Sequence, residues 1–254
     1  MKIGEVRDAN RKIVGRTILH FDAVESTNET AKELLESDVE EGLVVWADRQ
    51  AAGRGRHGRA WASPLGGLYT SFILRPKETH AWVLGLLVGM PVVKALRHFG
   101  VFGGLKYPND AVYQGRKIAG ILSEGVYRRD VYHVVGGIGV NTNVDLEKLP
   151  PDVRATATTL KREVRLFVPN DEFLDYLLNQ IDDLYSRYRH TRVEFLLKDY
   201  RGQCTTIGKR VTARTGRLAV TGKAYDIAVN GALVIMDDSG AKHEFVEGNL
   251  EILK

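Results

Sequence analysis

The chain has 254 residues, of which 44% are hydrophobic and 27% are charged, and this composition excludes a disordered or collagen-like protein. Lys and Arg outnumber Asp and Glu by 36 to 32, a net charge of +4, which is a smaller excess than a non-specific nucleic-acid binder usually shows. The single cysteine, Cys204, excludes an internal disulfide and a Cys-rich zinc site.

Nothing in the sequence predicts export or membrane insertion. Residues 1–7 lack the apolar core of a signal peptide. The longest uncharged apolar run, residues 81–93, is too short to span a bilayer and contains two glycines and Pro91, so we expect a buried helix. With the lone cysteine, these features predict a cytoplasmic protein without a membrane partner.

The first hundred residues predict alternating strands and helices. Hydroxyl and amide side chains at residues 26–29 are typical of a cap, so we expect a helix to follow them. The apolar run before residue 48 predicts a strand that leads into a glycine-rich loop at 49–59. The expected strands are 17–22, 43–47 and 68–74, and the expected helices are 30–35 and 81–99, the latter started or broken near Pro91.

The middle of the chain predicts a hairpin and a long helix. Residues 108–110 are a turn, and Gln114-Gly115 joins two hairpin strands. Apolar residues then recur at helical intervals over 173–188. The expected elements are strands 111–113, 117–124 and 131–143, and helix 173–188.

The pattern of apolar and polar residues changes after Cys204. Residues 209–254 are short alternating segments with turn signals at 230–231 and 238–240, which predict a small five-stranded β-barrel. We therefore predict an α+β (α/β) protein with a mixed-sheet catalytic domain at 1–203 and a small β-barrel domain at 204–254.

The loop Gly53-Arg-Gly-Arg-His-Gly58 holds the clearest chemical signal. Its three spaced glycines fit the dinucleotide-binding pattern, but residues 59–67 cannot open the helix that this pattern requires. Arginines between glycines suit a loop that closes over anions, because guanidinium groups bind carboxylates and phosphates bidentately. The alternative is a solvated basic loop or an RGG-like nucleic-acid tail.

Two further groups of residues carry weaker signals. The first is Lys106-Tyr-Pro-Asn-Asp110 with Lys117-Ile-Ala-Gly120 and Glu124 after it, and its Pro-Asn-Asp segment could be an ordinary turn. The second is Gly136-Gly-Ile-Gly-Val-Asn-Thr-Asn143, whose glycines could mark no more than a bulged strand.

Taken together and in this order, the segments resemble the biotin protein ligase family. The resemblance covers residue 17 to the C-terminus and includes the small β unit, which looks like that family's Src-homology-3-like C-terminal barrel. Two positions depart from the pattern: His57 stands where arginine is commonest, and Tyr107 stands where tryptophan is commonest. No winged helix-turn-helix precedes residue 17, so the chain looks like the single-function type without a DNA partner.

The resemblance implies a two-step reaction. ATP and biotin would give biotinyl-5′-AMP and pyrophosphate, with Mg²⁺ carried by the ATP phosphates, and a lysine of a biotin carboxyl carrier protein would then take the biotin. It also implies a homodimer formed through sheet edges.

The resemblance also assigns the site residues. Those implied in catalysis are Lys117, Arg54, Arg56 and Asp110, although Asp110 could simply cap its turn. Those implied in biotin binding are Ser26, Thr27, Asn28, Gln50, Gly53, Arg54, Lys117, Gly120 and Ile138. Those implied in ATP or adenylate binding are Arg54, Arg56, Arg59, Trp61, Asn109, Lys117 and Asn141.

Two alternatives stay open. A lipoate protein ligase or octanoyl transferase would share the fold, but the transferases use a cysteine nucleophile and Cys204 lies far along the chain from the loop. A nucleic-acid-binding module built on the barrel and the basic loop would leave Lys117-Ile-Ala-Gly120 unexplained, and its binding would depend steeply on salt.

Overall fold

The computed structural model describes residues 2–77, 81–216, 218–246 and 248–253. One eight-stranded sheet forms the body of the molecule, with the strand order β1-β2-β3-β4-β8-β7-β6-β5. Neighbouring strands are antiparallel except β2 and β3, which are parallel. The strands are β1 (Lys2–Arg7), β2 (Thr17–Phe21), β3 (Val44–Ala47), β4 (Leu68–Leu74), β5 (Gly104–Lys106), β6 (Asp110–Tyr113), β7 (Arg116–Arg128) and β8 (Val131–Val140).

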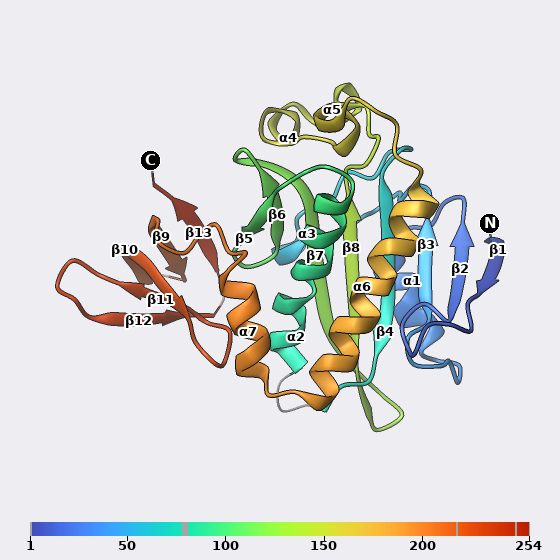
Figure 1. Ribbon diagram of the computed structural model, residues 1–254, viewed down its shortest axis with the longest axis horizontal. Coiled ribbons are helices and arrows are strands. Elements are labelled where there is room, and N and C mark those ends of the chain that lie inside the picture. The colour runs from blue at the N-terminus through green and yellow to red at the C-terminus, as the bar shows by residue number, and fades with distance from the viewer. Residues whose placement is uncertain (1, 78–80, 217, 247, 254) are drawn as a thin grey trace.

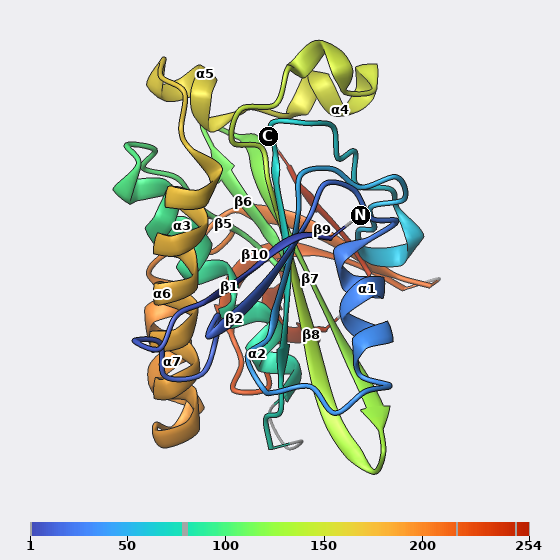
Figure 2. The same cartoon turned by 90° about the vertical axis from the view of Figure 1, so that its right-hand side faces the viewer.

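Helices cover the two faces of the sheet unequally. Seen edge-on in Figure 2, α2, α3, α6 and α7 lie on one side of the strands and α1 lies on the other. The short helices α4 and α5 sit at one end of the sheet (Figure 1). The helices are α1 (Thr27–Leu34), α2 (Ala81–Leu87), α3 (Gly89–His98), α4 (Pro151–Thr156), α5 (Leu160–Val164), α6 (Asn170–His190) and α7 (Val193–Arg201). None of the helices in the described residues is long and apolar enough to cross a bilayer.

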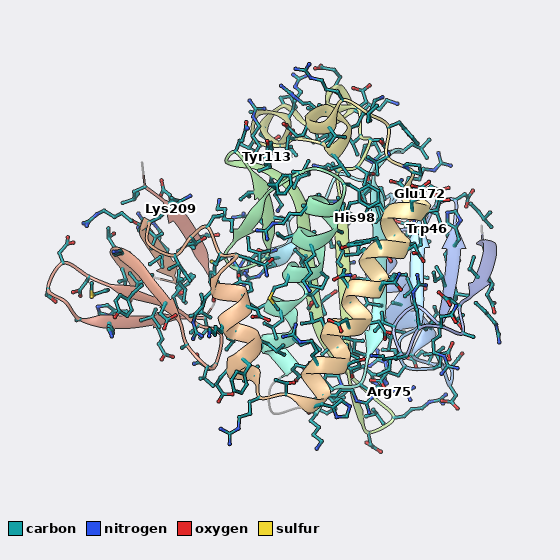
Figure 3. The ribbon with its side chains drawn as sticks, in the orientation of Figure 1. Trp46, Arg75, His98, Tyr113, Glu172 and Lys209 are labelled. Carbon is teal, nitrogen blue, oxygen red and sulfur yellow. The ribbon has the colours of Figure 1, made fainter. Side chains whose placement is uncertain are left out.

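The core lies between the sheet and the helical layer of α3 and α6. Every residue of β4 is buried, because this strand sits inside the sheet and is covered on both faces. His98 of α3, labelled in Figure 3, stacks on Tyr176 of α6 with ring centroids 3.9 Å apart. The opposite face carries a smaller apolar cluster under α1.

The C-terminal residues form a second, five-stranded antiparallel sheet, as the sequence predicts. Its strand order is β12-β11-β10-β9-β13. Leu105 of β5 donates its N–H to Gln203 O at 2.8 Å and accepts from Thr205 N at 2.7 Å, which ties the large sheet to the segment that leads into the second sheet. The boundary after residue 203 falls at this junction and stays a prediction. The strands are β9 (Arg210–Thr215), β10 (Leu218–Ile227), β11 (Leu233–Met236), β12 (Lys242–Phe245) and β13 (Asn249–Ile252).

Local differences from the sequence-based elements have simple causes. The helix expected at 81–99 is two helices that break at Val88, and Pro91 lies in the first turn of α3, where its missing N–H costs nothing. Helix α1 begins three residues early, at Thr27, and Ser26 makes no side-chain capping bond. Strands β1 and β5 were not expected, because β1 is mostly exposed and polar and β5 has three residues.

Candidate functional site

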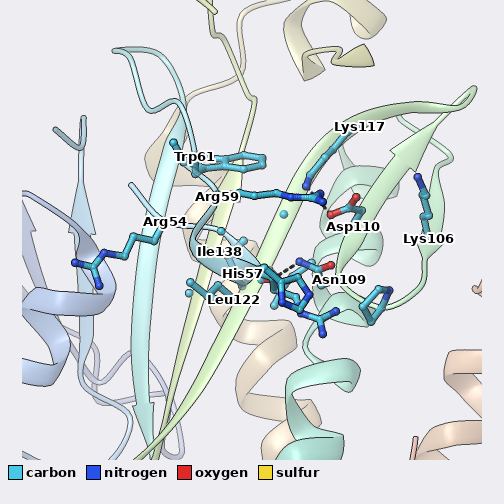
Figure 4. Close-up of a pocket in the computed structure, with 18 of the residues that line it drawn as sticks. Arg54, His57, Arg59, Trp61, Lys106, Asn109, Asp110, Lys117, Leu122 and Ile138 are labelled. Atoms are coloured by element: carbon cyan, nitrogen blue, oxygen red, sulfur yellow. Dashed lines mark hydrogen bonds and ion pairs between the residues drawn. The ribbon is translucent and has the colours of Figure 1, made fainter. Parts of the chain in front are cut away.

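A cavity of about 350 Å³ lies on the α1 face of the large sheet, where strands β7 and β8, the 53–61 loop and the second sheet meet (Figure 4). The polypeptide segments that line it are far apart in sequence, and strands β9 and β13 complete its wall. The predicted residues that it brings together are Ser26, Thr27, Asn28, Gln50, Arg54, Arg56, Arg59, Trp61, Asn109, Asp110, Lys117, Gly120 and Ile138.

Two predicted residues do not line the cavity. Gly53 lies beneath it, where an added Cβ would meet Trp61 O at 2.5 Å, so only glycine lets the loop approach so closely. Asn141 is buried, and its Nδ2 donates to Thr158 O at 3.2 Å, which fastens the segment before α5. A contact between Asn141 and nucleotide therefore stays a prediction.

The glycine-rich loop has a defined shape. Gly55 N donates to Arg59 O at 2.7 Å, and Trp61 N donates to Gly53 O at 2.9 Å, so the loop closes on itself. His57, the residue that departs from the family pattern, has φ +57° and sits in the left-handed region at the tip. Asparagine, aspartate and histidine tolerate that conformation better than other side chains with a Cβ.

The loop's arginines are held apart by neighbours on the cavity rim. Arg54 Nη1 lies 2.9 Å from Glu29 Oε1 and points away from Lys117 and Asp110 in Figure 4. Arg59 Nη2 donates to Asn249 Oδ1 of strand β13 at 2.9 Å. Both contacts are exposed, so each stabilises the loop by only about 0–1 kcal/mol and can be exchanged for a ligand.

Lys117 occupies the centre of the charged end. Its Nζ lies 2.6 Å from Asp110 Oδ1 and 5.1 Å from the centroid of the Trp61 ring. The indole reaches this position because Gly120 and Gly139 lack side chains: an added Cβ would lie 2.8 Å from Trp61 Cζ3 at Gly120 and 2.3 Å from Trp61 Nε1 at Gly139. The three groups form a compact cation–carboxylate–aromatic arrangement suited to anions and a flat ring.

The opposite end of the cavity is uncharged and polar. Gln50 Oε1 accepts from Thr27 N at 2.8 Å and from Thr27 Oγ1 at 3.1 Å. Gln50 Nε2 donates to Ser63 Oγ at 2.8 Å, which uses one of its two hydrogens. The Ser26 hydroxyl makes no capping bond to α1. This end therefore offers both donors and acceptors to a neutral polar group.

Tyr107 does more than form an aromatic wall. Its ring is 4% exposed, and its hydroxyl donates to Phe245 O of strand β12 at 3.1 Å. Its N–H donates to Thr206 Oγ1 at 3.0 Å. Burial raises the pKa of the Tyr107 phenol to about 12. Tyr107 therefore also links the two sheets beside the cavity.

Sequence reasoning missed one group of residues that complete the site. Ser71 lies within a fully buried strand and carries no motif, so no local signal identifies it. The second sheet supplies Thr212, Arg214, Asn249 and Glu251, whose proximity to the loop no local pattern encodes. Among the described residues there is no group of three or more His, Cys, Asp or Glu side chains that could hold a metal ion.

Comparison with known protein families covers both sheets. A model of the biotin/lipoate A/B protein ligase family matches residues 20–141. A model of the biotin protein ligase C-terminal domain matches residues 206–249.

Individual proteins show the same similarity. The bifunctional ligase/repressor BirA of Bacillus subtilis is 32% identical over 241 residues, which span 91% of this chain and 73% of that protein. The biotin–[acetyl-CoA-carboxylase] ligase of Mycobacterium tuberculosis is 32% identical over 231 residues, which span 85% and 82%. The solved structure of Aquifex aeolicus biotin protein ligase with biotin and ATP is 31% identical, with a TM-score of 0.81 over 93% of this chain and 99% of that one.

Proposed function

Because the chain belongs to the biotin/lipoate A/B protein ligase family and carries the C-terminal domain of biotin protein ligases, we propose that it is an ATP-dependent biotin protein ligase. The biotin carboxylate attacks the α-phosphorus of ATP, which forms biotinyl-5′-AMP and releases pyrophosphate. A lysine ε-amine of a biotin carboxyl carrier protein then attacks the acyl carbon, which forms an amide and releases AMP. One observation carries the proposal: a single cavity joins the arginine-bearing loop, Lys117 beside Asp110, and the polar groups of α1.

The first step requires two anions to meet. Two unit charges 4 Å apart repel by about 4 kcal/mol at an effective dielectric constant of about 20. Lys117, Arg54, Arg56 and Arg59 offset this repulsion and stabilise charge on the phosphoryl oxygens. Arg54 leaves its exposed carboxylate partner on α1 to do so, which costs little because such exposed pairs are weak.

The uncharged end of the cavity suits the ureido ring of biotin. That ring has one C=O acceptor and two N–H donors, so it needs partners of both kinds. The free hydrogen of Gln50 Nε2 and the Ser26 hydroxyl can donate to the C=O, and Thr27 Oγ1 can accept from an N–H. Gly120 and Ile138 leave room for the rest of the molecule.

The nucleotide occupies the other end. Trp61 covers the adenylate, because its ring already lies flat over the glycines of β7 and β8. Asn109 precedes β6 and is held by the neighbouring strand β7, because its Nδ2 donates to Ile121 O at 2.9 Å. Asn109 lines the cavity below Asp110 in Figure 4, and its Oδ1 can accept from the nucleotide or water.

The second step requires a neutral amine. Deprotonation of an ordinary lysine, whose pKa is about 10.4, costs roughly 4.6 kcal/mol at pH 7. Asp110 accepts or orients that proton, because its carboxylate lies in the cavity beside Lys117, the residue that holds the biotin carboxylate and the phosphate. Catalysis by such a positioned carboxylate typically contributes about a hundredfold or more.

Magnesium enters with the nucleotide. Because the described residues offer no cluster of metal ligands, we propose that the ion arrives bound to the ATP phosphates as part of the substrate. No step above depends on a protein-held metal.

The polypeptide partner and the assembly are also proposals. The carrier protein docks where the adenylate is exposed, and the protein acts in the cytoplasm without DNA. We further propose a homodimer through the β1 edge, which exposes Ile3 by 57% and Val6 by 54%. Sedimentation velocity tests the dimer directly.

Pyrophosphate exchange into ATP separates this function from its alternatives. We expect exchange with biotin, and none with lipoate or octanoate. Exchange with lipoate alone would establish the lipoate ligase alternative, which the C-terminal domain match argues against. Absence of exchange with all three acids, together with salt-dependent RNA or DNA binding, would establish the nucleic-acid-binding alternative.

A further inference from the structure

A chain of hydrogen bonds runs beneath the uncharged end of the cavity and begins at Glu124 of β7. Its Oε1 accepts from Lys32 Nζ at 2.7 Å, and its Oε2 accepts from Asn28 Nδ2 at 2.7 Å. Although burial lowers the pKa of Lys32, its bonds to Glu124 and Glu29 raise that pKa by more, so the amine stays charged. A carboxylate can only accept and an ammonium can only donate. The direction of donation at this end of the hydrogen-bond chain, its polarity, is therefore fixed.

That polarity fixes the orientation of the Asn28 side-chain amide. Its Nδ2 donates to Glu124 and also to Leu122 O at 3.3 Å, which uses both hydrogens. Its Oδ1 therefore faces Ser71 Oγ, 2.6 Å away. The amide is 4% exposed, and an added Cβ on Gly137 would lie 2.1 Å from Oδ1, so the group is pressed against bare backbone. Asn28 thus has no hydrogen left for a ligand.

Ser71 extends this direction of donation from Asn28 to Thr27. Its hydroxyl lies within hydrogen-bond distance of Asn28 Oδ1 and of Thr27 Oγ1, at 2.6 and 2.7 Å, but it has one hydrogen. Because Asn28 Oδ1 can only accept, that hydrogen goes to Asn28. The Thr27 hydrogen then stays inside the protein, on Ser71 Oγ or on Gln50 Oε1 at 3.1 Å. Thr27 Oγ1 therefore presents lone pairs to the cavity.

We infer that Glu124, which does not line the cavity, is a positioning residue that makes the Thr27 hydroxyl an acceptor for a ureido N–H of the ligand. Lys32 is its counter-charge. This inference rests on the proposed function and adds a specificity determinant to it: a ligand must bring an N–H donor to Thr27. A ligand with only acceptors there would leave two sets of lone pairs facing each other.

The substitution Glu124→Gln tests the inference, because it preserves the shape of the side chain but replaces a group that can only accept by one that both accepts and donates. Lys32 can only donate, so it holds the new Gln Oε1 and turns the new NH₂ toward Asn28. Two NH₂ groups then face each other, the Asn28 amide reverses, and Ser71 donates to Thr27 Oγ1, so that Ser71 takes one of the two lone pairs that the wild-type hydroxyl keeps for a ligand. We expect biotin binding, measured by calorimetry without ATP, to weaken about tenfold, the equivalent of one hydrogen bond of roughly 1.4 kcal/mol.

Two matched variants exclude a merely structural role. In Lys32→Met/Glu124→Gln no ammonium orients the amide of the introduced glutamine. Its oxygen can therefore turn to Asn28, and biotin binding recovers to within about threefold of the wild type. Lys32→Met alone weakens binding less than Glu124→Gln does, because the carboxylate still only accepts. In a Thr27→Val background, Glu124→Gln has an effect of less than about twofold, since no hydroxyl remains to be turned.

The outcomes separate this inference from the proposed function. If the wild-type chain binds biotin, but Glu124→Gln binds it equally well or the double variant binds as weakly as Glu124→Gln, the positioning role is wrong and the function stands. If the wild-type chain binds no biotin, the function itself fails. Thermal unfolding of each variant confirms that the compared proteins are folded.

Discussion

Lys117 Nζ lies 2.6 Å from Asp110 Oδ1, so the cation at the charged end of the cavity is already paired with a carboxylate. The two residues stand on neighbouring strands, β7 and β6, and their side chains are 33% and 21% exposed. An incoming carboxylate or phosphate must share Lys117 with Asp110 or displace it. We propose that an anion which displaces Asp110 frees this carboxylate to act as a base on the carrier lysine.

Replacing Lys117 by Met should abolish adenylate formation. The substitution removes the cation between the two anions and should lower the rate of biotin-dependent pyrophosphate exchange by about a hundredfold to a thousandfold. The control is Lys148→Met, which removes an exposed lysine outside the cavity and should leave exchange unchanged. Exchange by Lys117→Met close to the wild-type rate would show that Lys117 does not stabilise the transition state.

Replacing Asp110 by Asn should separate the two half-reactions. The amide keeps the shape of the carboxylate but cannot take a proton from the carrier lysine, so transfer from preformed biotinyl-5′-AMP should fall about a hundredfold or more. Pyrophosphate exchange should persist, because Lys117 remains and loses its competing anion. An equal fall in exchange and transfer would mean that Asp110 serves only to hold Lys117 or the turn.

The sequence predicted many of the residues that line the cavity because they are concentrated in short segments. The loop arginines, Lys117 and Asp110 each belong to a local motif, and the hairpin that joins β6 to β7 brings the last two together. The alternating pattern over 68–74 likewise predicted β4 at its observed bounds, although both faces of this strand are buried.

The remaining features depend on contacts between distant residues. Arg59 and Asn249 are 190 positions apart, and no periodicity predicts that they share a hydrogen bond. Ser71 looks like any polar residue within a buried strand until Asn28 is seen beside it. Strand β5 has three residues and owes its place to pairing with β6 and to its bonds with residues 203 and 205, so its own sequence carries little signal.

Replacing Gly139 by Ala should displace the Trp61 ring. An added Cβ would lie 2.3 Å from Trp61 Nε1 and 2.6 Å from Cε2, so the indole must leave the sheet. Overpacking of this kind costs about 1–3 kcal/mol, which corresponds to roughly a tenfold to hundredfold loss of ATP affinity if the ring covers the nucleotide. Gly4→Ala is the control, because its Cβ would meet no atom within 4 Å. Unchanged ATP affinity, measured by calorimetry, would remove Trp61 from the nucleotide site.

Replacing Tyr107 by Phe should weaken the junction between the sheets in a manner that depends on pH. The variant loses the buried bond to Phe245 O, so at pH 7 its free energy of unfolding should fall by about 1 kcal/mol.

The wild-type advantage of Tyr107 should then shrink in alkali. Burial raises the pKa of the folded phenol to about 12, whereas the unfolded phenol ionises near a pKa of about 10. Between these values the unfolded chain releases a proton that the folded chain keeps, so the free energy of unfolding of the wild type falls as pH rises, and that of Tyr107→Phe lacks this loss. Urea unfolding at pH 7, 9 and 10.5 measures the difference, and Tyr113→Phe, whose hydroxyl bond is exposed, is the control. A constant gap between wild type and Tyr107→Phe across this range would show that the phenol ionises equally in both states and does not tie the second sheet to the cavity.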